Sequence, residues 1–416
     1  MSTALNSTRR VAALTRQMVL QKAGVTWSRR VHGDTFSRLF TDDLDPFVVY
    51  EHLRGQGQWT STSFGMKVLT AHRTCSEVLS SRAFGVTPAD GEDPFEAGVD
   101  LSLLQINPPD HTRLRRLAAP AFSRRRMQGY TTRIESTIDA LLAQAPTHEP
   151  WDLVAGYASP LPIAVITDML DIPSYDEPAF RGYGEAIAGA LDGVRSPRHA
   201  TDLVRASVAL EEMFTRLFAL READPGDDVI STLVAAREEG SVTPEEMVPL
   251  CTLLLVAGFE TTVNLIGAAV DILLDRPEEW EALVADPSLA EPVVEETLRF
   301  APPVHLTGRH ALTDTRVGDV EVAAGDGVLV MIAAAGRDPE VFDRPAEFDP
   351  RRENAADHLA FSAGAHYCLG APLARLEATL ALEALARAMP TLRRAGPTVP
   401  RRAVTVRGPL TLPVTT

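Results

Sequence analysis

The sequence is poor in lysine and in cysteine. Its 416 residues include 40 basic side chains, of which only Lys22 and Lys67 are lysine. The arginine bias, together with abundant alanine, indicates a GC-rich bacterial genome. The three cysteines, Cys75, Cys251 and Cys368, are too few and too scattered for a disulfide framework or a zinc cluster. A reducing compartment, here the cytoplasm, is the simplest expectation.

Long apolar runs and an excess of positive charge are also absent. No stretch approaches ~20 consecutive apolar residues, so we expect no membrane-spanning helix. With 40 basic against 56 acidic residues the net charge is −16, which argues against nucleic-acid binding. The hydrophobic content of 45% is enough for a large core, and the length alone suggests two or three domains.

The first 33 residues depart from this acidic balance, because the first acidic residue is Asp34. The composition is similar to that of an organellar transit peptide, but a bacterial genome favours a short basic amphipathic helix that either packs on the globular body or extends away from it. We therefore predict a basic helical extension over residues 1–35 and the globular body over 36–416. The basic residues of the extension are Arg9, Arg10, Arg16, Lys22, Arg29 and Arg30.

One cysteine precedes a predicted helix. Cys368 lies in a loop that begins at Phe361 and contains Gly364, and Gly370 follows it before a helical run from Ala371 to Ala388. A thiolate at a helix N-terminus is stabilised by the helix dipole and by free backbone N–H groups. Such a thiolate is a nucleophile or a ligand for a soft metal centre. The ordinary alternative is a buried structural cysteine.

A long apolar helix is predicted from Thr243 to about Asp275, a length of roughly 50 Å. Its start is a capping box, Thr243-Pro244-Glu245-Glu246, and its middle is apolar almost all round, which predicts a central buried helix. The segment Ala257-Gly258-Phe259-Glu260-Thr261-Thr262 interrupts this pattern with a glycine, an acid and two threonines, as functional sites often do. The alternative is a kink at Gly258 with Thr261 hydrogen-bonded back to a carbonyl.

Two polar pairs occur at helical spacing. His111 and Arg115 follow the helix start Pro108-Pro109-Asp110, and their i, i+4 spacing puts both donors on one face. They either bind an anion or form a solvated basic face. Glu296 and Arg299 lie at i, i+3 on another predicted helix. Alone this second pair is weak evidence, because any helix can carry one.

In their order along the chain, these motifs resemble those of the cytochrome P450 superfamily, in its soluble, bacterial, ferredoxin-dependent form. The resemblance extends from Pro46 to Val414 and implies one mainly α domain with small β sheets at one side (an α+β fold). It implies haem b as the cofactor and residues 36–416 as the haem domain. Cys368 is then the axial thiolate, which favours O–O cleavage. The motif around it comprises Phe361, Gly364, His366, Gly370, Ala374, Arg375 and Glu377.

The resemblance also assigns the charged pairs. It implies that His111, Arg115, Arg309 and His366 bind the haem propionates. Glu296 and Arg299 would form a buried structural ion pair that stabilises the cysteine-bearing core.

On the long helix, the resemblance implies that Ala257 and Gly258 allow close approach to the haem face. Thr261 would stabilise the hydrogen-bond network around bound dioxygen, and Glu260 would help deliver protons from solvent. These two residues are the candidate catalytic pair.

Two positions depart from the family pattern. Gly336 stands where asparagine is usual, before Arg337-Asp338-Pro339, and Glu347 stands where an arginine usually joins the structural pair. We therefore expect the third partner of that pair to be Arg351, Arg352 or a backbone group.

The candidate substrate pocket carries no charge that would anchor an ionic substrate. We expect the loop of residues 84–104 to line it, since long loops in compact domains are usually functional. The tip of a terminal hairpin, formed by Ala403–Arg407 and Leu410–Val414, would enter it. The predicted lining residues on other elements and at this tip are Val256, Phe259, Val304, Leu306 and Leu410.

The function implied is that of a haem-thiolate monooxygenase. One oxygen atom from O2 would enter a C–H or C=C bond of an apolar small molecule, such as a secondary metabolite, a steroid or a terpenoid. No flavin or nucleotide motif is visible, so electrons would come from a ferredoxin and its reductase, docked on a basic patch of Arg113, Arg116, Arg124, Arg125 and Arg126. The alternatives are a peroxide-driven or oxidative-coupling haem-thiolate enzyme and a non-catalytic haem-binding protein.

Overall fold

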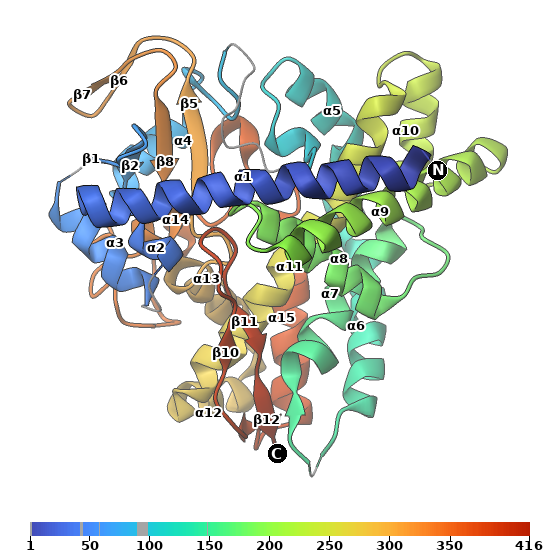
Figure 1. Cartoon of the computed structure of the whole chain (residues 1–416). Helices are drawn as coiled ribbons and strands as arrows, with labels where there is room; N and C mark the ends of the chain where they lie inside the picture. The colour runs from blue at the N-terminus through green and yellow to red at the C-terminus, as the bar shows by residue number, and fades with distance from the viewer. Residues whose placement is uncertain (1, 42–44, 58, 90–98, 148) are drawn as a thin grey trace.

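Helix α11 (Pro244–Leu274) runs through the middle of the molecule (Figure 1). The structure is a computed structural model that describes residues 2–41, 45–57, 59–89, 99–147 and 149–416. The predicted capping box is present, with the backbone N–H of Thr243 donating to the side chain of Glu246 over 2.8 Å. By length and composition α11 could cross a membrane, but 78% of its apolar stretch is buried inside the protein, as expected of a core helix.

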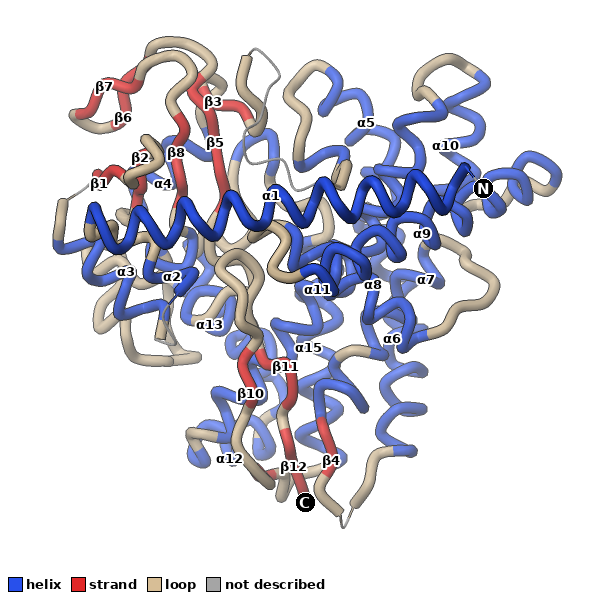
Figure 2. The backbone as a smooth tube through the Cα atoms, in the orientation of Figure 1, coloured by secondary structure: helices blue, strands red, loops and turns tan. Residues whose placement is uncertain are grey.

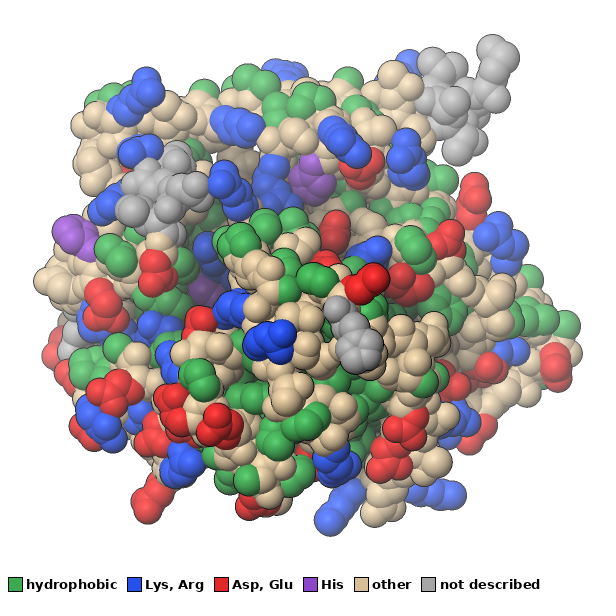
Figure 3. Space-filling view, turned by 90° about the horizontal axis from the view of Figure 1, so that it is seen from below, with side chains coloured by type: hydrophobic (Ala, Val, Ile, Leu, Met, Phe, Trp, Pro, Cys, Tyr) green, Lys and Arg blue, Asp and Glu red, His purple; other side chains and the backbone are tan. Residues whose placement is uncertain are grey.

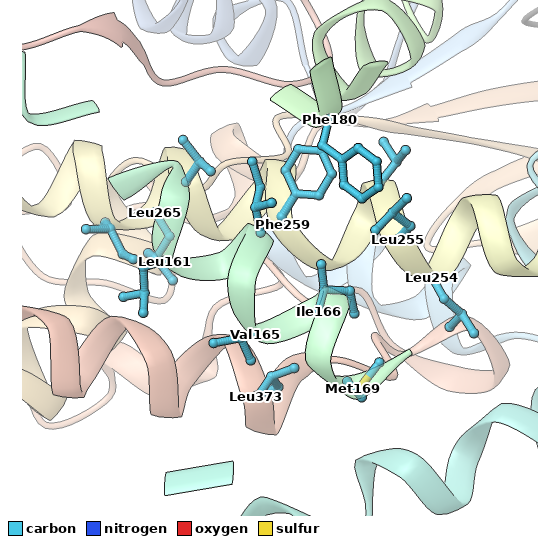
Figure 4. Packing of buried hydrophobic residues seen from close by; sticks show 14 of the residues in the cluster. Leu161, Val165, Ile166, Met169, Phe180, Leu254, Leu255, Phe259, Leu265 and Leu373 are labelled. Carbon is cyan, nitrogen blue, oxygen red and sulfur yellow. The ribbon is translucent and has the colours of Figure 1, made fainter. Parts of the chain in front are cut away.

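Helices surround α11 on several sides, and the expected mainly α architecture with small sheets is confirmed (Figure 2). In Figure 4 Phe259 of α11 lies beside Phe180 of α8 and close to Ile166 of α7. These buried rings and branched chains join the three helices into one apolar core. The helices of this part are α5 (Asp110–Ala118), α6 (Arg124–Gln144), α7 (Pro160–Met169), α8 (Glu177–Ala190), α9 (Pro197–Ala223), α10 (Val229–Glu238), α12 (Pro277–Ala285), α13 (Ala290–Phe300) and α15 (Ala371–Ala388).

The largest sheet has five strands in the order β1-β2-β8-β5-β3. It lies to one side of these helices, at the upper left in Figure 2. β1 and β2 pair antiparallel, from Trp59 opposite Leu69 to Ser61 opposite Lys67, and form a hairpin. The strands are β1 (Trp59–Ser61), β2 (Lys67–Leu69), β3 (Phe84–Gly85), β5 (Thr307–Ala311) and β8 (Gly327–Val330), with α3 (Pro46–Gly55), α4 (His72–Ser80) and α14 (Ile332–Ala335) nearby and the small hairpin β6 (Thr315–Val317) and β7 (Val320–Val322).

The C-terminal strands pair differently from our expectation. β11 (Pro409–Thr411) pairs with β10 (Val399–Pro400), and β12 (Pro413–Thr415) lies between β4 (Trp151–Asp152) and β9 (Arg393–Arg394). The predicted hairpin of residues 403–407 with 410–414 is therefore wrong. The reason is that the backbone N–H groups of Val404 and Thr405 donate to the carboxylate of Asp192, over 2.7 Å each, and are not available to a strand partner.

The N-terminal helix α1 (Ser2–His32) lies across the front of the body in Figure 1. Leu14, Met18 and Val25 are buried on its inner side, where α1 contacts α9 and the short helix α2 (Arg38–Thr41). The basic segment is thus a helix packed along the body.

Candidate active site

The loop of residues 361–370 brings Cys368 to the N-terminus of α15. The backbone N–H of Cys368 donates to the carbonyl of Phe361 over 2.8 Å, which closes the loop. Gly364 has a φ of +66°, and a Cβ there would lie 2.6 Å from the carbonyl oxygen of Leu79. Only glycine fits both the left-handed backbone and this close approach. Gly370 directly precedes α15.

The sulfur of Cys368 differs from the other two thiols in its surroundings. Cys75 and Cys251 are buried, and burial raises the pKa of both, as expected of inert structural cysteines. Burial also raises the pKa of Cys368, but the backbone N–H groups of Gly370 and Ala371 and the charge of Arg115 oppose that rise. This is the predicted helix-terminus environment for a thiolate.

Cys368 nonetheless has accessible surface, although it lies among desolvating neighbours. The middle of α11 also has accessible surface. Ala257 is exposed there and Thr261 is half-buried, in a run that is otherwise mostly buried. Exposed positions in the interior of a core helix indicate that this face meets space rather than packed side chains. A flat apolar group could fit against such a face, as haem ligation by Cys368 requires.

Four basic side chains gather from three separate parts of the chain. The rings of His111 (α5) and His366 (cysteine loop) lie 4.1 Å apart between centroids. The charges of Arg115 (α5) and Arg309 (β5) both act on His366. Arg309 is buried and donates to the hydroxyl of Thr307 over 3.0 Å and to the carbonyl of Gly308 over 2.7 Å. The structure thus brings the four predicted anion-binding residues together.

A bound anion would stabilise this basic cluster. Burial lowers the pKa of Arg309 to about 10, and burial with the nearby positive charges lowers the pKa of His366 to about 3. Among the residues that the structure describes, neither Arg115 nor Arg309 forms an ion pair, and the buried Nδ1 of His111 has no hydrogen-bond partner. Unpaired buried cations are costly, so a site of this composition fits a dianionic group such as a pair of carboxylates.

The candidate catalytic pair projects in two directions. The hydroxyl of Thr261 donates to the carbonyl of Ala257 over 3.1 Å, on the accessible face. Glu260 is buried, with Oε1 3.1 Å from a guanidinium nitrogen of Arg401. Burial raises the pKa of Glu260, Arg401 opposes the rise and Glu185 adds to it. Of our alternative expectation, the hydrogen bond of Thr261 back to a carbonyl is present, while α11 continues unbroken through Gly258.

Gly258 lies at a close contact between two helices. A Cβ at this position would lie 2.7 Å from Cδ1 of Ile166, so the glycine allows α7 to pack closely against α11. Ala257, one residue earlier, lies on the accessible face. The two residues differ in this way because neighbouring helix residues point about 100° apart.

Glu296 and Arg299 form a fully buried, bidentate ion pair, with nitrogen–oxygen distances of 2.6 and 2.7 Å. The other donors of Arg299 reach the backbone carbonyls of Gly336, Pro345 and Glu347 over 2.8 to 2.9 Å. These bonds attach α13 to the segment that leads into the cysteine loop.

The third partner of the pair is Arg352, whose Nε lies 3.3 Å from Oε1 of Glu296. Arg351, the other candidate, binds Glu279 instead. The side chain of Glu347 turns outward to Arg344. Gly336 is explained by space, because a Cβ there would lie 2.4 Å from the carbonyl oxygen of Arg299.

Among the described residues, the predicted pocket residues lie in several different surroundings. Phe259 and Val256 are buried in the helical core, and Leu306 packs in a separate cluster beside the large sheet. Val304 forms an isolated bridge with Val406. Leu410 lines a pocket of about 310 Å³ that also contains Glu260 and Arg401. Residues 90–98 of the predicted pocket loop lie outside the described residues.

The predicted basic patch is smaller than expected. Arg113 binds Glu246 over 2.6 Å and Asp110 over 3.0 Å, and Arg126 binds Asp227. The exposed members are Arg116, Arg124 and Arg125.

Sequence reasoning missed several residues of the site. Arg401 lies 141 positions from Glu260, and no local pattern relates them. Ser362 has a φ of +61° and a hydroxyl 3.4 Å from Arg309. The only feature of the sequence that could have indicated Ser362 is its position in the cysteine loop.

A cysteine at a helix N-terminus, an accessible face on the central helix and a basic cluster define a haem-thiolate protein. The sequence profile of the family described as Cytochrome P450 matches residues 196–388. Cytochrome P450 107B1 of Saccharopolyspora erythraea is 40% identical over 331 residues, covering 78% of this chain and 80% of the relative. Cytochrome P450 monooxygenase PikC of Streptomyces venezuelae is 37% identical over 362 residues, covering 83% and 84%.

The same likeness holds in three dimensions. The ligand-free crystal structure of Mycobacterium smegmatis CYP164A2 matches with a TM-score of 0.85 and 37% identity, covering 92% of this chain and 99% of that chain. The chain therefore belongs to the cytochrome P450 family. It is a P450 monooxygenase whose cofactor is a haem-thiolate, and its family works with redox partner proteins and small-molecule substrates.

Proposed function

We propose that this monooxygenase holds its haem through the thiolate of Cys368 and inserts one oxygen atom into an apolar small molecule. The observation that supports this assignment best is the environment of Cys368, an accessible sulfur at the N-terminus of α15 with backbone N–H groups directed at it. Because burial raises the pKa of this thiol, a cation is needed to keep the sulfur ionised. Ferric or ferrous iron would supply that cation. When bound, the haem would supply the site for dioxygen reduction by two electrons from the redox partner and two protons, with one oxygen atom entering the substrate and the other leaving as water.

We assign the basic cluster to the haem propionates. Arg115 and Arg309 would supply charge-assisted hydrogen bonds, and His111 and His366 would bind as neutral imidazoles, since the pKa of each is lowered. Bringing two carboxylates into the cluster would offset the mutual repulsion of the arginines. The cofactor would thereby be oriented by α5, β5 and the cysteine loop together.

We assign proton handling to Thr261 and Glu260. The hydroxyl of Thr261 lies on the accessible face of α11 and can orient a proton there. Glu260 faces the pocket that Arg401 and Leu410 line, where it can exchange protons with solvent. Because the two side chains point in different directions, passage between them requires bridging solvent or a rotation of Glu260.

The substrate we propose is a mostly apolar molecule of medium to large size, such as a secondary metabolite, a steroid or a terpenoid. The accessible face of α11 carries Ala257 and the hydroxyl of Thr261 and no charged side chain among its central turns. Such a surface offers hydrophobic contact and one orienting hydrogen bond.

We propose a ferredoxin as the electron donor, docked beside the cysteine loop. Arg116, Arg124 and Arg125 are exposed there, next to Phe122, whose ring approaches the position of a Cβ on Gly370 to 3.7 Å. Ferredoxins are acidic, so this remaining basic patch would steer the partner toward the thiolate side. Arg116→Glu and Arg125→Glu should slow reduction by ferredoxin and leave reduction by dithionite intact.

The test of the central assignment is the carbon monoxide difference spectrum of the reduced protein. Wild type should show the red-shifted band of thiolate ligation, and Cys368→Ser should abolish it. Cys251→Ser, a buried cysteine elsewhere, is the matched control and should keep the band. A normal band in Cys368→Ser refutes the proposal.

A further inference from the structure

The outer face of α1 carries an apolar and basic stripe that nothing in the monooxygenase reaction uses. Arg9, Arg16, Leu20, Trp27 and Val31 follow one another at spacings of seven, four, seven and four residues, which places them on one face of a helix. All five are exposed, and Leu20, Trp27 and Val31 are 64%, 55% and 63% accessible. The opposite face, with Leu14, Met18 and Val25, is buried against the body.

Exposed apolar side chains concentrate on α1 and its neighbours. Within the described part of the chain, 14 large hydrophobic side chains are exposed, and four of them belong to α1. Phe64 is another, and its ring would lie 3.5 Å from a Cβ on Gly24. Leu191 is also exposed, and it precedes Asp192, whose carbonyl accepts a hydrogen bond from Gln21 of α1 over 2.9 Å. Solitary exposed apolar residues are ordinary, but a cluster on one side marks an interaction surface.

The charge of α1 is opposite to that of the rest of the protein. The first 33 residues contain six basic and no acidic residues, so the remaining chain carries 34 basic against 56 acidic residues. Figure 3 shows blue and green side chains along the upper edge, where α1 runs, and many red side chains on the body below it. Among the described residues, Arg9, Arg10, Arg16, Lys22 and Arg30 form no ion pair.

We propose that the outer face of α1 docks the enzyme, lying flat, on the surface of an anionic phospholipid membrane. Basic side chains bind the headgroups, and Leu20, Trp27 and Val31 enter the boundary with the acyl chains, where tryptophan is favoured. The acidic body is repelled by the same surface, so the contact is confined to α1. This inference is independent of the monooxygenase assignment.

A second copy of the chain is a poorer occupant of this face. Two α1 helices packed face to face would set Arg9, Arg16 and Arg30 against the same residues, with no acidic residue on either helix to pair them. An acidic protein would match the charge, but a membrane offers both an anionic layer and an apolar layer beneath it, in the order the stripe needs.

The test is flotation of the full-length haem-loaded enzyme with lipid vesicles. Vesicles of equal parts phosphatidylcholine and phosphatidylglycerol should bind at least about tenfold more enzyme than pure phosphatidylcholine vesicles, and added salt should release it. Leu20→Glu with Trp27→Glu should abolish binding, whereas Leu220→Glu, an exposed leucine of α9, should not. Arg16→Glu with Arg30→Glu should also abolish binding, whereas Arg387→Glu with Arg393→Glu, an equal charge change on α15 and β9, should not.

Every variant is first checked for a normal carbon monoxide spectrum, which separates loss of folding from loss of docking. Equal binding to both vesicle types, or binding that the α1 variants retain, overturns the proposal. So does an enzyme that floats with neither vesicle. In that case, analytical sedimentation would show whether the stripe joins two copies of the chain. A pull-down with ferredoxin would show whether it binds an acidic protein.

Discussion

A guanidinium nitrogen of Arg401 lies 3.1 Å from the carboxylate of Glu260, in the pocket where Glu185 also lies. The two neighbours act on the pKa of Glu260 in opposite directions, since Arg401 lowers it and Glu185 raises it, while burial raises it most. The pKa of one buried acid, next to Thr261 in the sequence, is thus adjusted by two residues from distant parts of the chain.

The first prediction concerns the pH profile of coupled turnover. Arg401→Gln removes a cation that stabilises the ionised carboxylate, so the pKa of Glu260 rises and the limb of the profile that reports it moves to higher pH. Glu185→Gln removes a like charge and should move the same limb to lower pH. Product formation across pH 5 to 9 measures both shifts. Arg393→Gln is the control, and shifts of the same sign in both variants would contradict the assignment.

The second prediction separates the two threonines of α11. Thr261→Ala should lower the fraction of electrons recovered in product by about tenfold or more, because it removes the hydroxyl to which we assign proton orientation. Thr262→Ala should have little effect, since Thr262 is buried and bonds back to the carbonyl of Gly258. Product and hydrogen peroxide are measured per NADPH consumed. Substrate binding, followed by the spin-state shift, should survive in both variants, and equal coupling in both would count against the role of Thr261.

The third prediction concerns cofactor retention. Arg309→Gln should weaken haem binding by about 1.5–3 kcal/mol, the range for a hydrogen bond to a charged group. The same change should not destabilise the apoprotein, because it removes one of several crowded positive charges. Haem transfer to an acceptor globin and thermal unfolding of the apoprotein measure the two effects. A drop in apoprotein stability with unchanged haem affinity would assign Arg309 a structural role.

The fourth prediction concerns acid sensitivity of the apoprotein. The pKa of His366 is held near 3 in the folded chain, against about 6.5 when unfolded, so the unfolded state binds more protons at acid pH. Stability is therefore complete above about pH 6.5 and is lost progressively as pH falls toward 3. His366→Gln should flatten this part of the stability curve, measured by urea unfolding at several pH values. An unchanged slope would show that His366 does not titrate as inferred.

The fifth prediction compares buried and exposed ion pairs. Arg299→Leu leaves the buried carboxylate of Glu296 without its main partner and should cost about 3–5 kcal/mol in the free energy of unfolding. Arg351→Ala breaks an exposed pair with Glu279 and should cost at most about 1 kcal/mol. Urea unfolding measures both. Similar costs for the two would contradict the structural role of the Glu296–Arg299 pair.

Local patterns identified the elements of this protein better than their pairing. The capping box at Thr243 and the apolar run after it predicted α11 almost to the residue, because both signals are local. The cysteine loop was recognisable for the same reason. The role of Arg401 depends on a contact across 141 residues, and the pairing of β11 with β10 depends on Asp192 capturing two N–H groups of another segment. Such choices are made by tertiary competition for donors and acceptors, which a single sequence does not reveal.

Asp192 has a mechanical consequence. Its side chain holds Val404 and Thr405, and its own carbonyl is bound by Gln21 of α1. Asp192 is therefore a shared point of attachment for three segments: the connection between α8 and α9, the segment before β11, and the N-terminal helix. A displacement of any of the three must either break these bonds or carry the other two along, so Asp192 links α1 physically to the segment that follows Arg401.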